Sequence, residues 1–333
     1  IVPCYRIEDA SQRKSAVDRT PLHTRFIKSN LKEYQKQEVR LLKQFLRGIG
    51  CYGAEAEIQG FSGYLCELLI IKYDNFRTLL SKVKNWRYGE TIKFYDNAIP
   101  SFDTPLIVID PVDKDRNAAA AVSKEKFDLF TIAAREYLEK PRVTFFFPNP
   151  VIPWSLKEIG EKMHTAKYIG IRFRKPDILS ENLYPQIRKT MKSIRRYSEK
   201  QGFKIHDIKF HINKYIYIIV KTDVKPLSET FIQQGPPVNK KVNVKEFIDK
   251  WQDHPLTVKQ PYEENNRLYV EIKRRYRELK SFLTENLSKM PLGKNIEKEI
   301  KEEYEILEDE ELLLEELRIF WTQYFDQKYP WER

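Results

Sequence analysis

The spacing of the apolar residues changes in the middle of this chain, at the proline-rich segment Phe147-Pro148-Asn149-Pro150. Before this segment apolar residues recur at steps of three and four, as on one face of a helix, and after it they alternate, as in a strand with one buried face. The chain has 333 residues, and single cores seldom grow past about 250 to 300 residues. The sequence therefore predicts an α+β protein with more than one domain.

The first half is expected to be mainly helical. One helix is predicted over 24–46, where it is followed by the helix-breaking Gly48 and Gly50. A second, nearly all apolar helix should open at Ser62, whose hydroxyl can cap it, and a third is predicted over 123–140. The apolar run that ends at Pro111 predicts one short strand over 106–110.

The second half reads as a small α/β sandwich with a mixed or antiparallel sheet. Alternation predicts strands over 168–174, 205–213 and 215–222, with a helix over 183–201 after the first strand. Further along, a helix is expected near 244–252, a strand near 267–273 and helical sequence to the end. The acidic run 302–316 contains five leucines at or beside it, so we expect an amphipathic helix there that faces away from nucleic acid.

The balance of charge favours a polyanionic partner. The formal net charge is +11, although residues 301–333 hold 4 Lys and Arg against 11 Asp and Glu, so the rest of the chain is strongly basic. Charge alone leaves RNA binding and a merely lysine-rich surface equally open. The same two readings apply to the cations of the 183–201 helix, which are Arg188, Lys189, Lys192, Arg195 and Arg196.

Composition also bears on the surroundings of the protein. No apolar run approaches the ~20 residues of a membrane span, so no membrane partner is expected. The three cysteines are Cys4, Cys51 and Cys66, and none forms a CxxC pair. An odd number of dispersed cysteines indicates a reducing, cytoplasmic setting.

Two clusters in the first half carry groups that suit a triphosphate. Thr20 and His23 follow Arg19 near the start of a helix, where backbone amides add donors. The alternative is that Thr20 only caps the helix and His23 lies on the surface. Lys43 lies on the same predicted helix and is followed by Tyr52 in a glycine-flanked turn, which could equally be a plain connection.

Two further clusters bear on metal and nucleic-acid binding. The aspartates of 110–117 resemble a metal loop but lack the glycine and distal glutamate of a calcium-binding hand, and the five histidines show no ligand spacing, so no metal site is predicted. Arg172 and Arg174 end a strand, where arginine's planar group can pair with base edges or phosphates. No Walker A sequence or nucleophile elbow is present.

Taken in order, these clusters resemble the archaeal class I CCA-adding enzymes, which are CCA tRNA nucleotidyltransferases of the DNA polymerase β-like superfamily. The similar segments are 2–5, 15–23, 38–43, 52–55, 60–70, 110–117, 173–177, 182–186 and 292–295. The resemblance implies a head, neck, body and tail that add C, C and A to the tRNA 3′ end from CTP and ATP. After residue 200 it thins to scattered pieces.

The resemblance also implies roles for individual residues. The triphosphate ligands would be Thr20, His23, Lys43 and Tyr52. Arg174 would read the incoming base together with tRNA phosphates. The contacts to tRNA would come from Ser62, Gly63 and Tyr64 at the acceptor stem and from Lys294 and Asn295 nearer the tail.

In such enzymes Mg²⁺ is held by three carboxylates that lie upstream of the segment matched by 2–5, and none of the three is found in this sequence. We therefore expect no catalytic or metal-binding residue in this chain. Residues 1–23 would be the C-terminal remnant of the catalytic head, or palm, beginning with the end of a strand; 24–145 would be a helical neck domain, and 146–333 the α/β body and tail that bind tRNA.

This reading leaves other functions open. The chain could be inactive alone and act with a separate catalytic head chain, or it could be a non-catalytic tRNA-binding module. A poly(A) polymerase or oligoadenylate synthetase relative would share the neck, but the basic body argues for the tRNA enzyme. A homodimer is a further implication of the resemblance.

Overall fold

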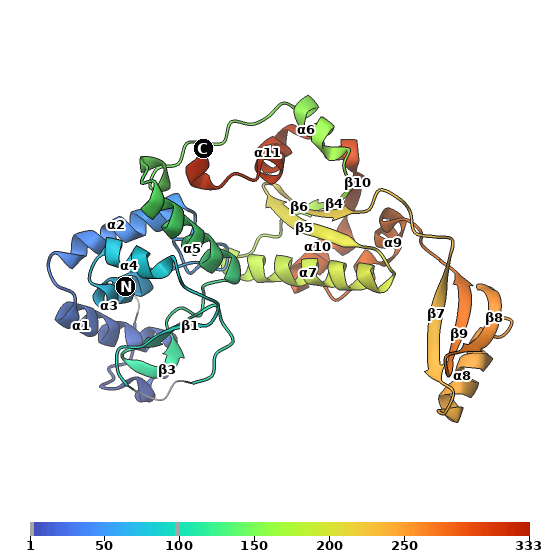
Figure 1. The fold of residues 1–333 in the computed structure, drawn as a ribbon, viewed down its shortest axis with the longest axis horizontal. Helices are drawn as coiled ribbons and strands as arrows, with labels where there is room; N and C mark the ends of the chain where they lie inside the picture. The colour runs from blue at the N-terminus through green and yellow to red at the C-terminus, as the bar shows by residue number, and fades with distance from the viewer. Residues whose placement is uncertain (1–2, 97–99) are drawn as a thin grey trace. The chain divides into compact units, whose positions relative to one another are not determined.

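The computed structural model describes residues 3–96 and 100–333. The chain divides into two compact units, both shown in Figure 1. The N-terminal unit comprises Ile1–Ile152, Ser180–Asn182 and Asp326–Arg333, and the C-terminal unit comprises Pro153–Leu179 and Leu183–Phe325. The mixture of helices and small sheets confirms the predicted α+β class.

In its described residues, the N-terminal unit is built on five α-helices. These are α1 (Thr20–Asn30), α2 (Gln35–Gly48), α3 (Gly63–Tyr73), α4 (Phe76–Val83) and α5 (Lys124–Glu139). As predicted, α3 opens after Ser62 and its apolar positions are buried, because an all-apolar helix is stable only inside a core. Around it, Phe45 of α2 contacts the rings of Phe76, Phe130 and Phe145.

The last residues of the chain belong to the same core. The indole of Trp331 stacks on Phe145 with ring centroids 5.2 Å apart, and its N–H donates to Glu136 Oε2 at 2.7 Å. Thr144 Oγ1 donates to the carbonyl oxygen of Trp331. Sequence more than 180 residues away therefore completes the helical core, which no local pattern could indicate.

A small sheet accompanies these helices. The predicted strand is β2 (Leu106–Asp110), which pairs in parallel with β1 (Glu90–Ile92) and antiparallel with β3 (Asp113–Asn117). Only β2 is apolar enough to be recognised from sequence, and β3 is a polar run. The tight β2–β3 connection brings Asp110 and Asp113 opposite each other.

The C-terminal unit contains the predicted β-α-β-β arrangement. Its antiparallel sheet has the order β10-β4-β6-β5, formed by β4 (Lys167–Arg174), β5 (Ile205–Ile212), β6 (Tyr215–Thr222) and β10 (Tyr304–Glu308). The side chains of β4 alternate between two cores, with Ile169 in one and Tyr168 in the other. Helices α7 (Ser180–Lys200), α9 (Leu279–Asn286) and α10 (Lys294–Glu302) cover one face, as Figure 1 shows for α7.

The opposite face of this sheet is covered by α6 (Leu156–Met163) and α11 (Arg318–Asp326). A second, three-stranded sheet of order β7-β9-β8 is formed by β7 (Thr230–Pro237), β8 (Thr257–Glu264) and β9 (Arg267–Lys273), with α8 (Lys241–Trp251) between the first two strands in sequence. The expected helix near 244–252 and strand near 267–273 are confirmed. The strands β7 and β8 were missed because prolines and polar residues obscure their alternation.

Three sequence expectations are wrong. The helix predicted over 24–46 is divided into α1 and α2 by the extended residue Leu31. Helix α2 begins at Gln35, whose side chain accepts a hydrogen bond from Lys32 N–H at 3.0 Å. Residues 3–5 form no strand, since Tyr5 N–H donates instead to Asp18 Oδ1. The first two residues of that expected strand lie outside the described residues.

The third error is the acidic run 302–316. It forms the edge strand β10 and then short 3₁₀ turns, rather than one amphipathic helix. Strand β10 pairs with the otherwise open edge of β4. The side chain of Leu312 packs so closely on Gly170 that a Cβ on this glycine would lie only 2.4 Å from the leucine. Tertiary pairing thus overrides a helical spacing of leucines. Across residues 3–96 and 100–333, no helix combines the length and apolar character needed to cross a bilayer.

Candidate functional site

The N-terminus of α3 gathers several of the predicted site residues. Ser62 caps this helix, with its Oγ accepting from Leu65 N–H at 3.1 Å. A Cβ added to Gly63 would lie 3.4 Å from the Tyr52 hydroxyl and 3.5 Å from Lys43 Nζ. The missing side chain therefore leaves a hydroxyl and an ammonium group beside the first turn, whose free backbone N–H groups favour an anion.

Lys43 and Tyr52 are both held in place. Lys43 Nζ forms a salt bridge with Glu67 Oε1 at 3.1 Å, and the two side chains are 22% and 27% exposed. The guanidinium of Arg47 lies 4.6 Å from the centre of the Tyr52 ring. The turn is fixed because a Cβ on Gly60 would lie 2.0 Å from the carbonyl oxygen of Cys51. Tyr52 thus lies in a fixed turn.

His23 and Tyr64 extend this cluster on its other side. Their rings stack with centroids 4.0 Å apart and an interplanar angle of 25°. His23 Nε2 lies 3.0 Å from Asp110 Oδ2, and the Tyr64 hydroxyl donates to Asp110 Oδ1 at 2.9 Å. The alternative that His23 is a surface residue is wrong, since its side chain is only 18% exposed.

Thr20 is the first residue of α1, is exposed, and lies one turn before His23. Arg19 occupies the capping position and makes no capping hydrogen bond with its side chain. The carbonyl oxygen of Thr20 accepts from Thr24 Oγ1 at 3.0 Å. The alternative that Thr20 only caps the helix is therefore wrong, and its hydroxyl remains an exposed polar group near the cluster.

Two arginines also belong to this region: Arg19, which the sequence analysis noted beside Thr20 and His23, and Arg116, which it did not single out. Arg116 Nη1 lies 2.6 Å from Asp110 Oδ2, and Arg19 Nε lies 2.8 Å from Asp113 Oδ2. A cavity of about 450 Å³ is lined by Arg13, Arg19, Ser62, Asp113, Asp115 and Arg116, among other residues. The aspartates of 110–117 resembled a metal loop in the sequence, but in the structure Asp110 and Asp113 hold cations and hydrogen-bond donors.

The buried polar groups shift one another's ionisation. Burial alone would raise the pKa of Asp110, but hydrogen bonds from His23, Val112 N–H and Arg116 lower it overall. Burial, followed by the charge of Asp110, raises the pKa of Tyr64, so this hydroxyl stays protonated and remains a donor. Asp110 is therefore a carboxylate surrounded by donors.

The remaining predicted residues lie in the C-terminal unit. Arg174 is the exposed last residue of β4 and lines a cavity of about 470 Å³ together with Arg172, Lys214 and Tyr215. Its neighbour Arg172 is engaged, because its guanidinium pairs with Glu305 at 2.8 Å and lies 4.0 Å from the centre of the Tyr215 ring. Arg174 is thus the freer of the two arginines.

Lys294 and Asn295 form the first turn of α10 and differ in availability. Asn295 exchanges two hydrogen bonds with Gln186 of α7, through its backbone N–H at 2.7 Å and its side-chain Oδ1 at 3.1 Å. Lys294 is exposed. Asn295 therefore mainly joins α10 to α7, whereas Lys294 projects a free-standing cation.

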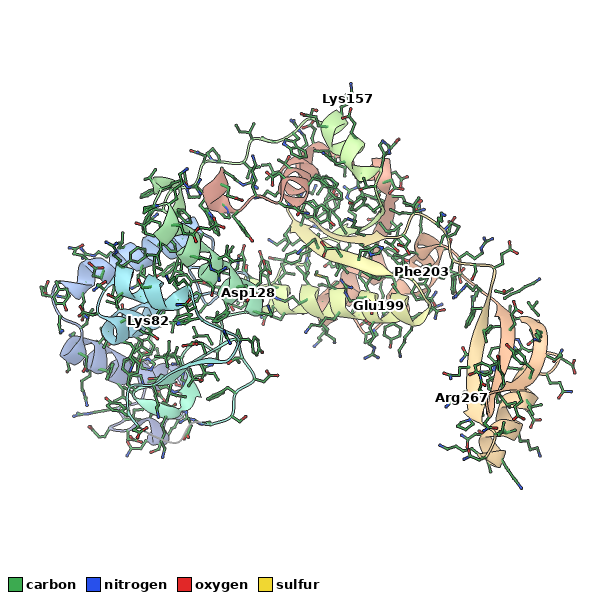
Figure 2. All side chains as sticks on the ribbon, viewed as in Figure 1. Lys82, Asp128, Lys157, Glu199, Phe203 and Arg267 are labelled. Carbon is green, nitrogen blue, oxygen red and sulfur yellow. The ribbon has the colours of Figure 1, made fainter. Side chains whose placement is uncertain are left out.

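The basic face of α7 is a second candidate surface. Lys189, Lys192, Arg196 and Lys200 are exposed and follow one another at steps of three and four, so they share one face of the helix. Figure 2 labels Glu199 near the end of α7; this carboxylate pairs with Arg195 at 3.4 Å. On the buried side of α7, Ile187 and Ile194 enter the core.

The described part of the chain contains no set of ligands that suits Mg²⁺. Within residues 3–96 and 100–333 no group of three or more His, Cys, Asp and Glu side chains could hold a metal ion. Asp110 and Asp113, the aspartates closest in kind to metal ligands, are occupied by His23, Tyr64 and the arginines. No step of the chemistry is therefore assigned to a metal held by these residues.

Comparison with known proteins agrees with this architecture. Residues 37–147 match the family model described as tRNA nucleotidyltransferase, second domain, and residues 164–309 match CCA-adding enzyme, C-terminal domain. The chain is 38% identical to the CCA-adding enzyme of Methanosarcina barkeri over 314 residues, which cover 93% of this chain and 68% of that protein.

Two further relatives bear the same name. Identity is 36% with the CCA-adding enzyme of Methanothermobacter thermautotrophicus, covering 92% of this chain and 67% of the relative. It is 34% with that of Archaeoglobus fulgidus, covering 95% of this chain and 72% of the relative. Identity of this extent across both units shows that the chain belongs to the CCA-adding enzymes, a family of tRNA nucleotidyltransferases.

Proposed function

We propose that this protein takes part in adding C, C and A to the tRNA 3′ end from CTP and ATP, and that the described residues bind the nucleotide and the tRNA. The observation that carries the proposal is the meeting of Lys43, Tyr52 and Gly63 at the capped start of α3. An ammonium group, a hydroxyl and free helix N–H groups together suit a triphosphate.

Within this proposal, Lys43 and His23 offset negative charge on the phosphates, and Thr20 and Tyr52 donate hydrogen bonds. Three features support it: the Gly63 backbone is open, the Lys43 ammonium is partly exposed, and a cavity containing Arg19 and Arg116 adjoins Ser62. That cavity is large enough for a part of the substrate beyond the phosphates. Ser62, Gly63 and Tyr64 would contact the end of the acceptor stem.

The C-terminal unit would hold the body of the tRNA. We assign Arg174 to the incoming base and to tRNA phosphates, since it is exposed beside Tyr215 and Lys214. Lys294 would contact backbone phosphate, and Asn295 would act by fixing the start of α10. In this view 24–145 is the neck and 146–333 the body and tail.

The test is equilibrium binding of CTP, ATP, GTP and UTP, and of tRNA lacking its terminal CCA, to the chain. CTP and ATP should bind more tightly than GTP and UTP, and the shortened tRNA should bind with strong salt dependence. Incorporation of radiolabelled CTP and ATP into the same tRNA is the second readout. Absence of nucleotide binding would contradict the assignment of Lys43 and His23.

A further inference from the structure

One buried carboxylate receives donors from three candidate site residues. Asp110 Oδ2 lies 3.0 Å from His23 Nε2 and 2.6 Å from Arg116 Nη1, while Oδ1 accepts from the Tyr64 hydroxyl at 2.9 Å. Oδ1 also accepts from Val112 N–H at 3.1 Å. These donors come from α1, β3, α3 and the β2–β3 turn, so a single side chain links four segments of the N-terminal unit.

Asp110 cannot itself contact a ligand, because its side chain is 0% exposed. Asp110 can therefore act on a ligand only through the side chains that hydrogen-bond to it. With Nε2 directed to the carboxylate, Nδ1 is the His23 nitrogen left for a ligand, and the stack on Tyr64 fixes the plane of the ring. Tyr64 directly follows Gly63, beside which Lys43 and Tyr52 lie.

We propose that Asp110 is the positioning residue of the nucleotide site. It holds the His23 ring stacked on Tyr64 and holds Arg116 at the rim, so that His23 Nδ1 and the remaining guanidinium N–H groups of Arg116 face the triphosphate together. This inference rests on the proposed function and goes beyond it by naming the group that arranges the ligands. Asp110 thereby couples α1, which carries Thr20 and His23, to the capped end of α3.

A purely structural role explains the arrangement less well. Burying a carboxylate is costly, and apolar residues of similar volume often give equal or greater stability. The charged carboxylate instead contributes orientation, because it aligns several hydrogen-bond donors at once. Asp113, at the other end of the same tight turn, provides a contrast: it is also buried, but it pairs with Arg19 and Arg13 and contacts neither His23 nor Tyr64 in the described residues.

The test uses Asp110→Asn in the full chain and two readouts. The first is the proton NMR signal of the His23 ring, identified through His23→Gln, which stacking on Tyr64 should shift upfield. Asp110→Asn should move this signal toward that of an exposed histidine, whereas the matched control Asp113→Asn should leave it in place. The second readout is binding, where CTP and ATP should both weaken about tenfold, the loss of one charged hydrogen bond.

The outcomes separate the inference from the proposed function. An unchanged His23 signal, or nucleotide binding that is unchanged or tighter in Asp110→Asn, overturns the positioning role. If the wild-type chain binds no nucleotide, the proposed function fails, while the NMR signal still tests whether Asp110 places His23. Should Asp110→Asn not fold, Tyr64→Phe removes one donor and keeps the ring; it should shift the His23 signal and weaken CTP several-fold, and no change in either would overturn the inference.

Discussion

The cations of the N-terminal unit and those of α7 are arranged in opposite ways. Around the start of α3, Lys43 pairs with Glu67, Arg116 with Asp110, and Arg19 with Asp113. On α7, Lys192 and Arg196 form no salt bridge with any described residue. Both regions are basic, but carboxylates fix the positions of these cations near α3, whereas on α7 the pair between Arg195 and Glu199 leaves Lys192 and Arg196 without a carboxylate partner among the described residues.

The difference predicts two modes of binding. Paired, half-buried cations have fixed positions and lose little freedom when a ligand arrives, so they suit a small anion of defined shape. Unpaired exposed cations suit a polyanion, whose counterions are released whatever its sequence, and their effect is screened by salt over about 10 Å. The N-terminal site should therefore discriminate, and α7 should supply affinity.

The largest expected effect is that of Lys43→Ala on nucleotide binding. Losing one charged contact to the triphosphate should weaken CTP and ATP by about 10- to 100-fold, with tRNA affinity nearly unchanged. Isothermal titration gives both constants. The matched control is Lys82→Ala, an exposed lysine of α4 labelled in Figure 2, which should alter neither. If tRNA affinity fell as much as nucleotide affinity, the contrast between the two regions would be broken.

Next in size is the double variant Lys192→Ala/Arg196→Ala on α7. If each cation neutralises one phosphate, the slope of log affinity against log salt should fall by about 1 to 2 and tRNA should bind more weakly at low salt. CTP binding should stay the same. The control is Lys157→Ala on α6, also labelled in Figure 2, because it likewise removes an exposed positive charge. An unaltered salt slope would mean that the α7 cations form only a solvated face.

The sequence predicted many of the elements and residues behind this contrast, but not the contacts that cause it. Periodicity predicted α3, α5, α7 and the strands β4 to β6, since these elements bury an apolar face. Local motifs singled out Lys43, Tyr52 and His23. What the sequence could not show was that the aspartates of 110–117 lie against His23 and the arginines, because those contacts join residues 87 and 94 positions apart. Nor could it show that 302–316 completes a sheet edge.

A smaller, opposite effect is expected from Glu67→Gln. Glu67 is the counter-charge of Lys43 at 3.1 Å, so a triphosphate must compete with it. Removing this charge while keeping the shape should tighten CTP and ATP binding by about two- to fivefold, in keeping with the modest strength of partly exposed ion pairs. Competition titrations with CTP would measure it. Weaker binding would instead show that Glu67 is needed to hold Lys43 in position.

The smallest effect concerns acid and the segment that precedes α1. Asp18 accepts hydrogen bonds from Tyr5 N–H at 3.0 Å and Ser15 N–H at 2.7 Å, which, with further bonds from Lys14 and Ser15, lower its pKa to about 2 despite the opposing effect of burial. An unfolded aspartate titrates near about 3.9. Its contribution to stability is therefore fully present above about pH 4 to 5 and is lost as the pH falls toward 2.

Calorimetry of the wild type and Asp18→Asn at a series of pH values tests this. The variant should melt at a lower temperature at pH 7 and pH 5, and the difference should shrink below pH 4, because Asp18 of the unfolded wild type then takes up a proton, which favours unfolding until the folded carboxylate is protonated near pH 2. Acid should thus loosen the segment that precedes α1; a melting difference that stayed constant down to pH 2.5 would show that Asp18 acts through its shape and not its charge.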